Sequence, residues 1–480
     1  MRVGRQCARS AEHVMRVFRH TLSPGVATSV AMDLFLCFAA VLLAASSLTT
    51  RYATIRGAVP ELPLILVGAS VFAVVMALMY AVVGLYRPAP IPLLSTVGRT
   101  VFSLAVGGYL TSLSLRTVAD RGYVEQLLPA AIMYLAVGLV FVHGGLYLMR
   151  RVATHPRVLI IGAGREAVSL ASDLRSAKRH ARHVVGLYPT MDDEDLSDAG
   201  KNLPKVFSRG DSIIDLVSRY KVQEIIVAVR EQRGGRVPMD ELLACRIRGI
   251  PVLDLAGYSE KTRCEVPIDS LKGSWLVYGH GFVQGDGRRF IKRVFDILSS
   301  ALLLVLLMPV MVLAAIAIKL ESRGPVLYRQ ERVGLGGRSF MCIKFRSMRA
   351  DAERDGVARW AVKNDPRVTA VGSFLRKSRI DELPQLWSVL TGEMSLVGPR
   401  PERPSFVEQL KQDIPFYEIR HTVKPGITGW AQVRYHYGAS LDDSRRKHQF
   451  DLYYVKNNSL FLDLIVLIET VSVIVFGEGQ

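Results

Sequence analysis

Cysteine is scarce in this sequence, and the few cysteines follow no pattern. The chain of 480 residues has 5 cysteines, which form neither a Cys-x-x-Cys pair nor a regular framework. A structural zinc site usually needs such pairs, and a disulfide-stapled fold needs a repeated spacing. The sequence therefore indicates neither, and it fits a compartment that keeps thiols reduced.

Acidic residues are also in short supply. The chain has 43 Asp and Glu against 61 Lys and Arg, which gives a formal net charge of +18. Such an excess of positive charge favours an anionic partner, namely nucleic acid, a phospholipid surface or phosphorylated substrates. Charge alone does not choose among the three.

Charged residues are rare in the first third of the chain, which contains four apolar blocks. These lie at Ala27–Ser47, Leu62–Tyr86, Leu93–Leu115 and Leu127–Met149. Each is close to the roughly 20 residues that cross a bilayer as a helix, although Arg99 interrupts the third. Arginines precede the first block, separate the second from the third and follow the fourth, so both ends are expected in the cytoplasm. The sequence predicts a four-helix transmembrane unit over residues 1–152.

Short apolar runs alternate with amphipathic stretches over residues 153–270. The predicted strands are Val158–Ile161, Val184–Tyr188, Glu224–Val229 and Val252–Leu255, and the predicted helices are Glu166–Ser176, Asp211–Tyr220 and Met239–Arg248. Alternation of strand and helix is typical of a parallel α/β sheet. We therefore expect a Rossmann-like α/β domain here.

Gly162 and Gly164 are candidate cofactor-binding residues of this domain. They follow the first predicted strand and open the first predicted helix, where a phosphate-binding turn belongs. The second strand, however, ends in Tyr188 and Pro189 rather than in an acidic residue, so a tight turn kept for packing is the alternative. The missing acid, and the lack of a Tyr-x-x-x-Lys pair, count against an NAD-dependent epimerase or dehydratase.

A glycine-rich linker, residues 271–288, leads to a fifth apolar block at Ile297–Ile318. Basic residues flank this block on both sides, so a straight crossing would place one cluster on the wrong side of the membrane. Pro309 removes a helix hydrogen bond and clashes with the preceding turn, which allows a sharp bend. We expect a re-entrant helix at about residues 290–320 that breaks at Pro309; a kinked spanning helix is the alternative.

The last apolar stretch, Leu460–Phe476, contains Asp463 and Glu469. These two acids interrupt it too strongly for a confident membrane crossing. We expect an interfacial or packed amphipathic helix there.

Asp381 and Glu382 are the candidate catalytic pair. Pro384 is tolerated only in the first turn of a helix, so the two carboxylates should lie at or just before a helix N-terminus. That helix should bury Leu383, Leu386, Trp387 and Leu390. A helix N-terminus favours ionised carboxylates, which suit nucleophilic attack or a hard cation. Taken alone, such a pair is more often a cap or a solvated charge pair.

Basic residues in rigid surroundings recur on both sides of this pair. Lys344 and Arg346 alternate with apolar residues, as on a half-buried strand. Gly398-Pro399-Arg400-Pro401 would present a guanidinium to a phosphate, and Lys424 lies in a second rigid turn. Together with the acidic pair and the re-entrant helix, these segments indicate a membrane-surface site for a diphosphate.

Three blocks carry a resemblance to a known family: Asp381-Glu382-Leu383-Pro384-Gln385-Leu386, Gly398-Pro399-Arg400-Pro401 and Lys424-Pro425-Gly426-Ile427-Thr428-Gly429-Trp430-Ala431-Gln432-Val433. The sequence closely resembles the bacterial polyprenyl-phosphate hexose-1-phosphate transferases, the monotopic phosphoglycosyl transferase family. The resemblance implies a mostly α-helical monotopic catalytic domain at 289–480, behind the membrane unit and Rossmann-like domain of the long form. One departure is Met308, where family members often have a serine before the proline.

The resemblance implies transfer of a sugar 1-phosphate from a UDP-sugar to undecaprenyl phosphate, with release of UMP. It assigns Asp381 as nucleophile and Glu382 as a Mg²⁺ ligand. The residues expected to bind substrate are Lys344, Arg346, Arg376, Arg400, Pro401 and Lys424. The expected setting is the bacterial inner membrane, as a multi-pass protein whose site faces the cytoplasm.

The expected partners are the UDP-sugar, undecaprenyl phosphate and membrane lipids, with no nucleic acid, and the large units leave room for a homodimer. The expected role is the first membrane step of exopolysaccharide, capsule or O-antigen synthesis. The spacing of residues does not reveal a sugar-contacting position, so it does not identify the transferred hexose. Glucose or galactose is a guess. Two alternatives stay open: a membrane glycosyltransferase that releases UDP, and a membrane scaffold whose α/β domain senses a nucleotide.

Overall fold

The computed structural model describes most of the chain. The described residues are 15–17, 20–22, 24–56, 62–86, 93–117, 121–152, 156–176, 182–190, 204–229, 237–268, 271, 281–282, 285–349, 352, 365–435 and 440–476. The chain divides into two compact units, the first formed mainly by Leu22–Lys261 and the second by Thr262–Gln480. A short pair of strands, β1 (Met15–Val17) and β2 (His20–Leu22), precedes the first long helix.

The first unit begins with the four predicted helices. They are α1 (Pro24–Arg56), α2 (Leu62–Val82), α3 (Leu93–Leu115) and α4 (Arg121–Val152). Their shared core is made of small and apolar side chains such as Ala44, Phe72 and Leu135. Within the described residues, α1, α2 and α4 contain stretches long and apolar enough to cross a membrane.

Helix α3 has the bounds that the sequence predicts, and its Arg99 is turned inward. The guanidinium is buried and donates to the carbonyl of Val83 at 2.8 Å. A buried charge needs such a partner. The crossing of the membrane by α3 stays a prediction.

The predicted parallel sheet is confirmed in the first unit. Its strands are β3 (Arg157–Ile161), β4 (His183–Tyr188), β5 (Glu224–Val227) and β6 (Val252–Asp254), in the order β4-β3-β5-β6. Every pairing is parallel. Three helices connect successive strands: α5 (Arg165–Ser176), α6 (Ile213–Tyr220) and α7 (Met239–Ile247). Helix α8 (Leu255–Arg263) follows β6.

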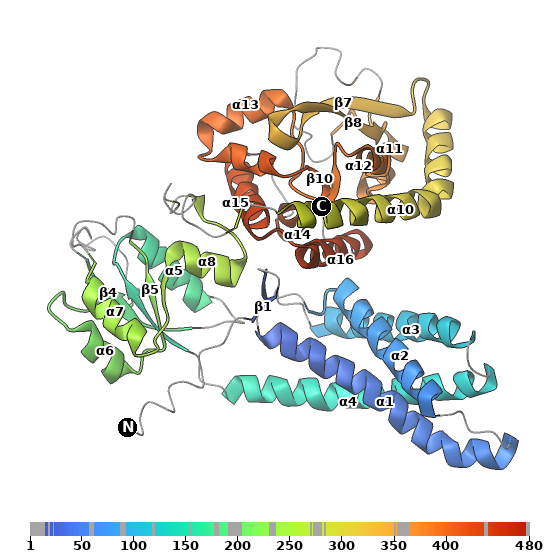
Figure 1. Cartoon of the computed structure of the whole chain (residues 1–480), viewed down its shortest axis with the longest axis horizontal. Coiled ribbons are helices and arrows are strands. Elements are labelled where there is room, and N and C mark those ends of the chain that lie inside the picture. The colour runs from blue at the N-terminus through green and yellow to red at the C-terminus, as the bar shows by residue number, and fades with distance from the viewer. Residues whose placement is uncertain are drawn as a thin grey trace. The chain divides into compact units, whose positions relative to one another are not determined.

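Two apolar cores explain why the strands read as continuous hydrophobic runs. Leu159 and Ile161 pack with α6 and α7, whereas Val158 and Ile160 face α5 and Tyr258. Successive side chains of a strand point to opposite faces, so a sheet covered by helices on both faces needs apolar residues throughout. Figure 1 shows this sheet between its helices.

The second unit is mostly helical around a small amount of sheet. It starts with α10 (Asp286–Glu321) and an antiparallel hairpin of β7 (Leu327–Val333) and β8 (Ser339–Phe345). It continues through α11 (Ala370–Lys377), η6 (Ile380–Glu382), α12 (Gln385–Thr391), β9 (Ser395–Val397), α13 (Pro404–Asp413), η7 (Tyr417–Thr422), β10 (Gly426–Thr428), α14 (Trp430–Arg434), α15 (Leu441–Asn457) and α16 (Leu460–Phe476). Its core surrounds the fully buried Trp430 and includes Val266 and Ile268, so those two residues pack with this unit.

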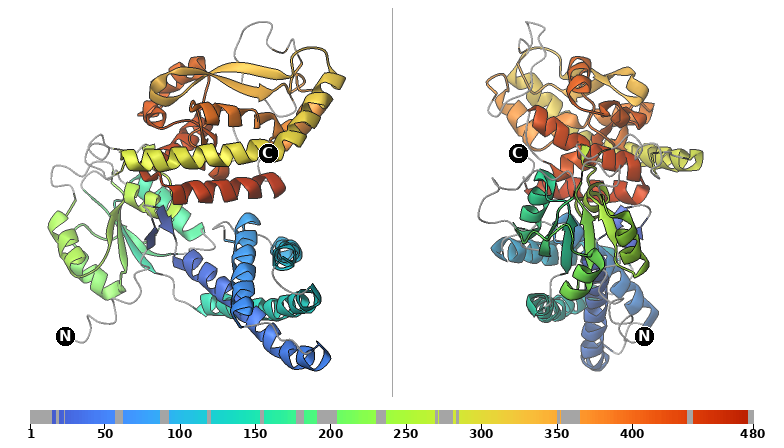
Figure 2. Two further views of the ribbon diagram at one scale, coloured as in Figure 1. Left: turned by 45° about the vertical axis from the view of Figure 1, so that its right-hand side comes forward. Right: turned by 90° about the vertical axis from the view of Figure 1, so that its left-hand side faces the viewer.

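Helix α10 contains a long apolar stretch, and most of its surface lacks a protein neighbour. Leu298, Val305 and Leu313 are each more than 60% exposed. Figures 1 and 2 show that α10 changes direction partway along, and Pro309 lies inside it. A long apolar helix surface is stable only when apolar groups of lipid or protein cover it. By length and composition, α10 could cross a membrane.

Helix α16 is packed within the unit, as its two acids predict. Asp463 is fully buried, pairs with Lys292 of α10 at 2.7 Å and accepts a hydrogen bond from the Tyr454 hydroxyl at 2.7 Å. Glu469 pairs with Arg434 at 2.8 Å. Figure 2 shows α16 running alongside the first part of α10. These buried ion pairs fix α16 to the elements beside it.

Candidate active site

A cavity of about 730 Å³ lies between the β7–β8 hairpin and helices α11, α13 and α15. Its lining includes eleven Lys and Arg side chains but four Asp and Glu side chains. Such a surplus of positive charge in a partly enclosed space strengthens the attraction for an anion. The cavity therefore suits a ligand with more than one phosphate.

The acidic pair lies in this cavity, on a turn that places both carboxylates under cover. Asp381 is 7% exposed and Glu382 is 6% exposed, and both belong to η6. Arg379 precedes the turn in the left-handed conformation, with φ 58°, which ends α11 and redirects the chain. Pro384 caps α12, so the prediction that the pair lies just before a helix is confirmed.

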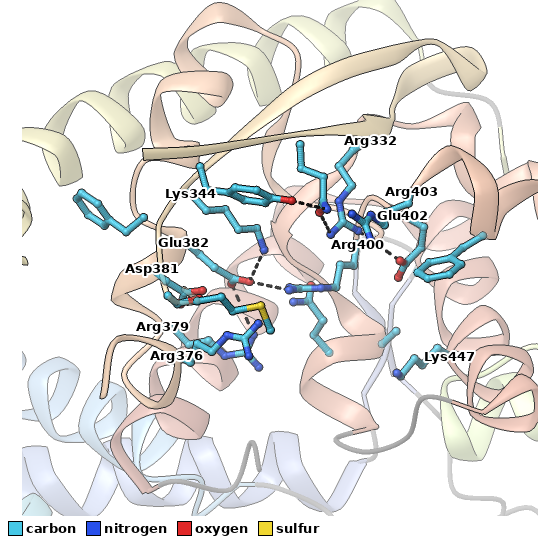
Figure 3. Close-up of a pocket in the computed structure, with 18 of the residues that line it drawn as sticks. Arg332, Lys344, Arg376, Arg379, Asp381, Glu382, Arg400, Glu402, Arg403 and Lys447 are labelled. Atoms are coloured by element: carbon cyan, nitrogen blue, oxygen red, sulfur yellow. Dashed lines mark hydrogen bonds and ion pairs between the residues drawn. The ribbon is translucent and has the colours of Figure 1, made fainter. Parts of the chain in front are cut away.

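Glu382 is neutralised by cations from three directions. Its Oε1 accepts from Arg400 at 2.7 Å and from Lys344 at 3.3 Å, and its Oε2 lies 3.5 Å from Arg379 (Figure 3). Burial acts to raise the pKa of Glu382, but Arg400, Lys344 and Arg379 hold that pKa well below its usual range. Glu382 is therefore a fixed negative charge.

Asp381 is in the opposite electrostatic position. Its Oδ1 is buried without a hydrogen-bond partner. Burial and the neighbouring Glu382 charge raise the pKa of Asp381 to about 6, despite the nearby Lys344, Arg400 and Arg376. The pKa values of the two carboxylates are thus shifted in opposite directions, which is typical of paired acids with different roles. Asp381 is the member of the pair left available for chemistry.

Two motifs far apart in the sequence meet backbone to backbone to place Arg400. Strand β9 leads into the Gly398–Pro401 loop and pairs in parallel with β10 of the second motif. A Cβ on Gly426 would lie 2.1 Å from the Gly398 nitrogen, and one on Gly398 would lie 2.3 Å from the Lys424 carbonyl. Only glycine permits this approach. The contact explains why both turns are rich in glycine and proline.

Of the predicted substrate-binding residues, the structure brings Lys344, Arg376 and Arg400 to the acidic pair. Lys344 and Arg400 contact Glu382, and Figure 3 shows Arg376 beside Arg379 below the pair. These three residues line one cavity, as the sequence predicts for a common site. Pro401 follows Arg400, and its carbonyl accepts from Arg332 at 3.0 Å, but it is not among the residues that line the described cavity. A binding role for Pro401 stays a prediction.

Arg346 lines the cavity, but its guanidinium is committed elsewhere. It donates to the Ser322 carbonyl at 2.8 Å, the Ser322 hydroxyl at 2.9 Å and the Arg323 carbonyl at 3.1 Å. These acceptors follow the end of α10, so Arg346 ties that helix to β8. A binding role for Arg346 stays a prediction.

Lys424 is not brought together with the other predicted residues and is not among those that line the described cavity. Its ammonium lies near Gly392 at the end of α12, where Arg293 is also close. Burial, together with Arg293 and Lys292, lowers the pKa of Lys424. The backbone contact at Gly426 holds the motif at the site, while the Lys424 side chain extends toward α10.

The exposure of Trp387 differs from the sequence-based expectation. It is 59% exposed, whereas the buried face of α12 consists of Gln385, Leu386, Ser388 and Val389. The prediction that Trp387 is buried is wrong because α12 starts only at Gln385, after a separate turn. The buried face is therefore rotated from the expected one.

Sequence reasoning missed several charged residues of the cavity. Arg379 had a local signal, because it lies three residues before Glu382 on a tight turn. Arg332 lies shortly before the Lys344 segment, and Glu402 directly follows the Gly398–Pro401 loop, so both had a local signal too. Lys447 and the buried pair of Arg420 and Asp451 had none, because they come from elements distant in sequence. Figure 3 shows Arg332, Glu402 and Lys447 on the side of the cavity away from Asp381.

The Gly162 turn in the first unit is accounted for by packing. Gly162 has φ +112°, and a Cβ there would lie 2.7 Å from the Ala228 carbonyl. Its nitrogen donates to the Tyr188 carbonyl at 2.7 Å. The turn thus lies close to the ends of β3, β4 and β5, where only glycine fits. Cofactor binding at Gly162 and Gly164 stays a prediction.

Comparison with known proteins places the chain. Residues 287–477 match the family described as bacterial sugar transferase. A UDP-glucose:undecaprenyl-phosphate glucose-1-phosphate transferase of Xanthomonas campestris pv. campestris is 33% identical over 67% of this chain and 67% of its own length. The chain belongs to the bacterial sugar transferase family.

Other members of this sugar transferase family match over shorter stretches. A UDP-N-acetylgalactosamine-undecaprenyl-phosphate N-acetylgalactosaminephosphotransferase of Aeromonas hydrophila is 46% identical over 50% of this chain and 55% of its own length. A UDP-glucose:undecaprenyl-phosphate glucose-1-phosphate transferase of Escherichia coli (strain K12) is 46% identical over 38% of this chain and 40% of its own length. The chain thus spans about half the length of these two relatives.

The contacts of Arg346 and Lys344 predict different defects. Arg346→Lys should lose most of the three hydrogen bonds to the end of α10 and lower stability by about 2 kcal/mol. Lys344→Met should lower stability as well, because it removes one of the three cations around the buried Glu382. Unlike Arg346→Lys, it should also weaken binding of pyrophosphate several-fold, because the cavity loses a cation. Thermal unfolding in detergent and calorimetric titration with pyrophosphate check both. An unchanged melting temperature in Arg346→Lys together with weaker pyrophosphate binding would show that Arg346 contacts the ligand.

Proposed function

We propose that this protein transfers a sugar 1-phosphate from a UDP-sugar to undecaprenyl phosphate and releases UMP. The observation that carries the proposal is the buried, electrostatically divided pair of Asp381 and Glu382 in a cavity lined by cations. The names of the relatives, which act on UDP-sugars and undecaprenyl phosphate, support the same reaction. The role would be the first membrane step of exopolysaccharide, capsule or O-antigen synthesis.

In the first half of the reaction, an Asp381 carboxylate oxygen attacks the phosphorus that carries the sugar. The new oxygen–phosphorus bond forms as the bond to the bridging oxygen breaks, and UMP leaves with that oxygen and its electron pair. The product is an aspartyl-phosphate sugar. Asp381 is the better nucleophile of the two because Glu382 is already bound by Lys344, Arg379 and Arg400.

In the second half, an oxygen of undecaprenyl phosphate attacks the same phosphorus. The Asp381 carboxylate leaves, and the sugar becomes linked to the lipid through a diphosphate. No base is required, because the attacking phosphate is already an anion. The atoms balance over the two steps: the donor loses UMP, and the acceptor gains the sugar 1-phosphate.

Repulsion between anions is the main barrier that the cavity has to reduce. The raised pKa of Asp381, caused by burial and by Glu382, shows that the carboxylate alone is poorly stabilised as an anion. Lys344, Arg376 and Arg400 supply positive charge around it and would also face the incoming diphosphate. The cations thus serve both the nucleophile and the substrate.

The two carboxylates also fit a magnesium ion. In the described residues no group of three or more His, Cys, Asp and Glu side chains forms a metal cage. Magnesium, however, usually binds one or two carboxylates and completes its shell with water and substrate phosphates. The Asp381 Oδ1, which has no hydrogen-bond partner, is free to bind such an ion. Glu382 could bind the same ion if one of its ion pairs were broken. Bound there, the ion would neutralise phosphate charge.

We infer that α10 enters the membrane from the cytoplasm and returns. Basic residues at both ends, Pro309 within the helix and its bent course support this arrangement. A helix held at this depth would keep the cavity near the lipid headgroups. There a membrane-bound phosphate and a soluble nucleotide sugar can both reach Asp381.

The reaction predicts UMP as the released nucleotide and a requirement for Asp381. Asp381→Asn should lower turnover by at least about a thousandfold, because an amide is a poor nucleophile. Labelled sugar should remain on the wild-type protein but not on the variant. Asp413→Asn, an exposed carboxylate on α13, is the control and should behave as wild type. Release of UDP would instead support a glycosyltransferase, and release of neither nucleotide would favour the scaffold.

The course of α10 predicts that both of its ends face the cytoplasm. Single cysteines replacing Phe290 and Leu320, which are 69% and 83% exposed, test this in a cysteine-free protein. Both should react with a membrane-impermeant maleimide in inside-out vesicles and neither in intact spheroplasts. Labelling of one position from each side would show a spanning helix.

Removal of divalent cations should stop the reaction. EDTA is expected to abolish UMP release, and added magnesium should restore it. Glu382→Gln should raise the magnesium concentration needed for half-maximal activity several-fold, because one ligand charge is lost. Full activity after exhaustive chelation would remove magnesium from the proposal.

A further inference from the structure

The loop that carries Arg400 depends on other segments of the unit for its hydrogen bonds. Pro399 and Pro401 have no backbone N–H, so neither can donate a hydrogen bond that would fix the loop. Each carbonyl of Pro399, Arg400 and Pro401 instead accepts from a different part of the unit. The donors are the Gly426 nitrogen at 3.0 Å, Arg420 at 2.8 Å and Arg332 at 3.0 Å, in that order.

Arg420 is the buried side chain among these donors. It is 6% exposed and lies in η7. One terminal nitrogen binds Asp451 of α15 at 2.9 Å as well as the Arg400 carbonyl, and the other donates to the Tyr417 hydroxyl. Asp451 is itself 2% exposed. A buried ion pair with these additional hydrogen bonds has little freedom to move.

We propose that Arg420, anchored by Asp451, is a positioning residue that sets where the Arg400 guanidinium meets Glu382. Arg420 holds the backbone of Arg400, and the Arg400 side chain then reaches Glu382 at 2.7 Å. Although Arg420 lines the cavity, both terminal nitrogens are engaged by protein atoms. Its effect on a ligand therefore passes through Arg400. This inference rests on the proposed function for its kinetic readout.

Arginine is the side chain that this position requires. A planar guanidinium can bond a carboxylate, a hydroxyl and a carbonyl at fixed angles at the same time. A lysine ammonium is a point charge that ends one bond short of the terminal nitrogens of arginine. It would keep a positive charge opposite Asp451 but would not hold the Arg400 carbonyl and the Tyr417 hydroxyl in the same geometry. Arg420→Lys thus separates positioning from charge.

A double-mutant cycle between Arg420 and Arg400 tests the proposal in the full-length protein. Arg420→Lys alone should lower kcat/KM for the UDP-sugar on the order of tenfold. In the Arg400→Ala background the same change should cost less than about twofold, because there is no guanidinium left to position. Equal losses in both backgrounds would overturn the proposal.

Arg434→Lys is the matched control. Arg434 pairs with Glu469 at 2.8 Å in the same unit, and within the described residues no hydrogen bond or ion pair joins it to the Arg400 loop. Its effect should be the same in the wild-type and Arg400→Ala backgrounds, even where it lowers the melting temperature. If it shows the same coupling as Arg420→Lys, the coupling reports general loss of structure and the proposal fails.

Two further measurements separate the possible failures. Calorimetric affinity for the UDP-sugar, measured over the same cycle, should show the same coupling whichever nucleotide is released. If UDP appears in place of UMP while the coupling persists, the proposed function fails and the positioning role stands. Should Arg420→Lys not fold, Tyr417→Phe loosens Arg420 more mildly and is expected to show a smaller coupling of the same sign. Independent effects there would contradict the proposal.

Discussion

The buried negative charge of Glu382 is the constraint around which the second unit is arranged. A carboxylate removed from water is stable only when cations surround it. Lys344 comes from β8, Arg379 from the end of α11 and Arg400 from the loop after β9, so three separate segments must converge on one side chain. The same convergence places Asp381 beside this negative charge, which helps to raise the pKa of Asp381 while the cations lower that of Glu382.

Periodic features of the sequence predicted the fold well. The alternation of apolar runs and helices around Val158 and Glu224 identified the parallel sheet, because strands buried on both faces are apolar throughout. Asp463 and Glu469 argued against a membrane crossing by α16, since a lone acid in a lipid-facing helix is unfavourable, and of the interfacial and packed alternatives the structure shows the packed one. The exposed Trp387 was not predicted, because the turn at Asp381 changes which face of α12 is buried.

The candidate site was predictable where rigid local motifs carry it. Pro384, Gly398 and Gly426 restrict the chain so strongly that the nearby Asp381, Glu382 and Arg400 could be singled out. Arg420 and Asp451 could not, because their importance comes from a contact between segments that no local spacing records. Lys424 shows the converse: its turn belongs to the site, but its side chain points to Gly392 and Arg293.

The order of these residues along the chain has a consequence for synthesis on the ribosome. Arg400 is made before Arg420, and Arg420 before Asp451, so the loop is translated ahead of the ion pair that holds the Arg400 carbonyl. That carbonyl stays in water until α15 has emerged and the ion pair can form. A nascent chain that stops short of α15 would display the acidic turn without a fixed Arg400. A correctly placed Arg400 would therefore be completed only late in synthesis.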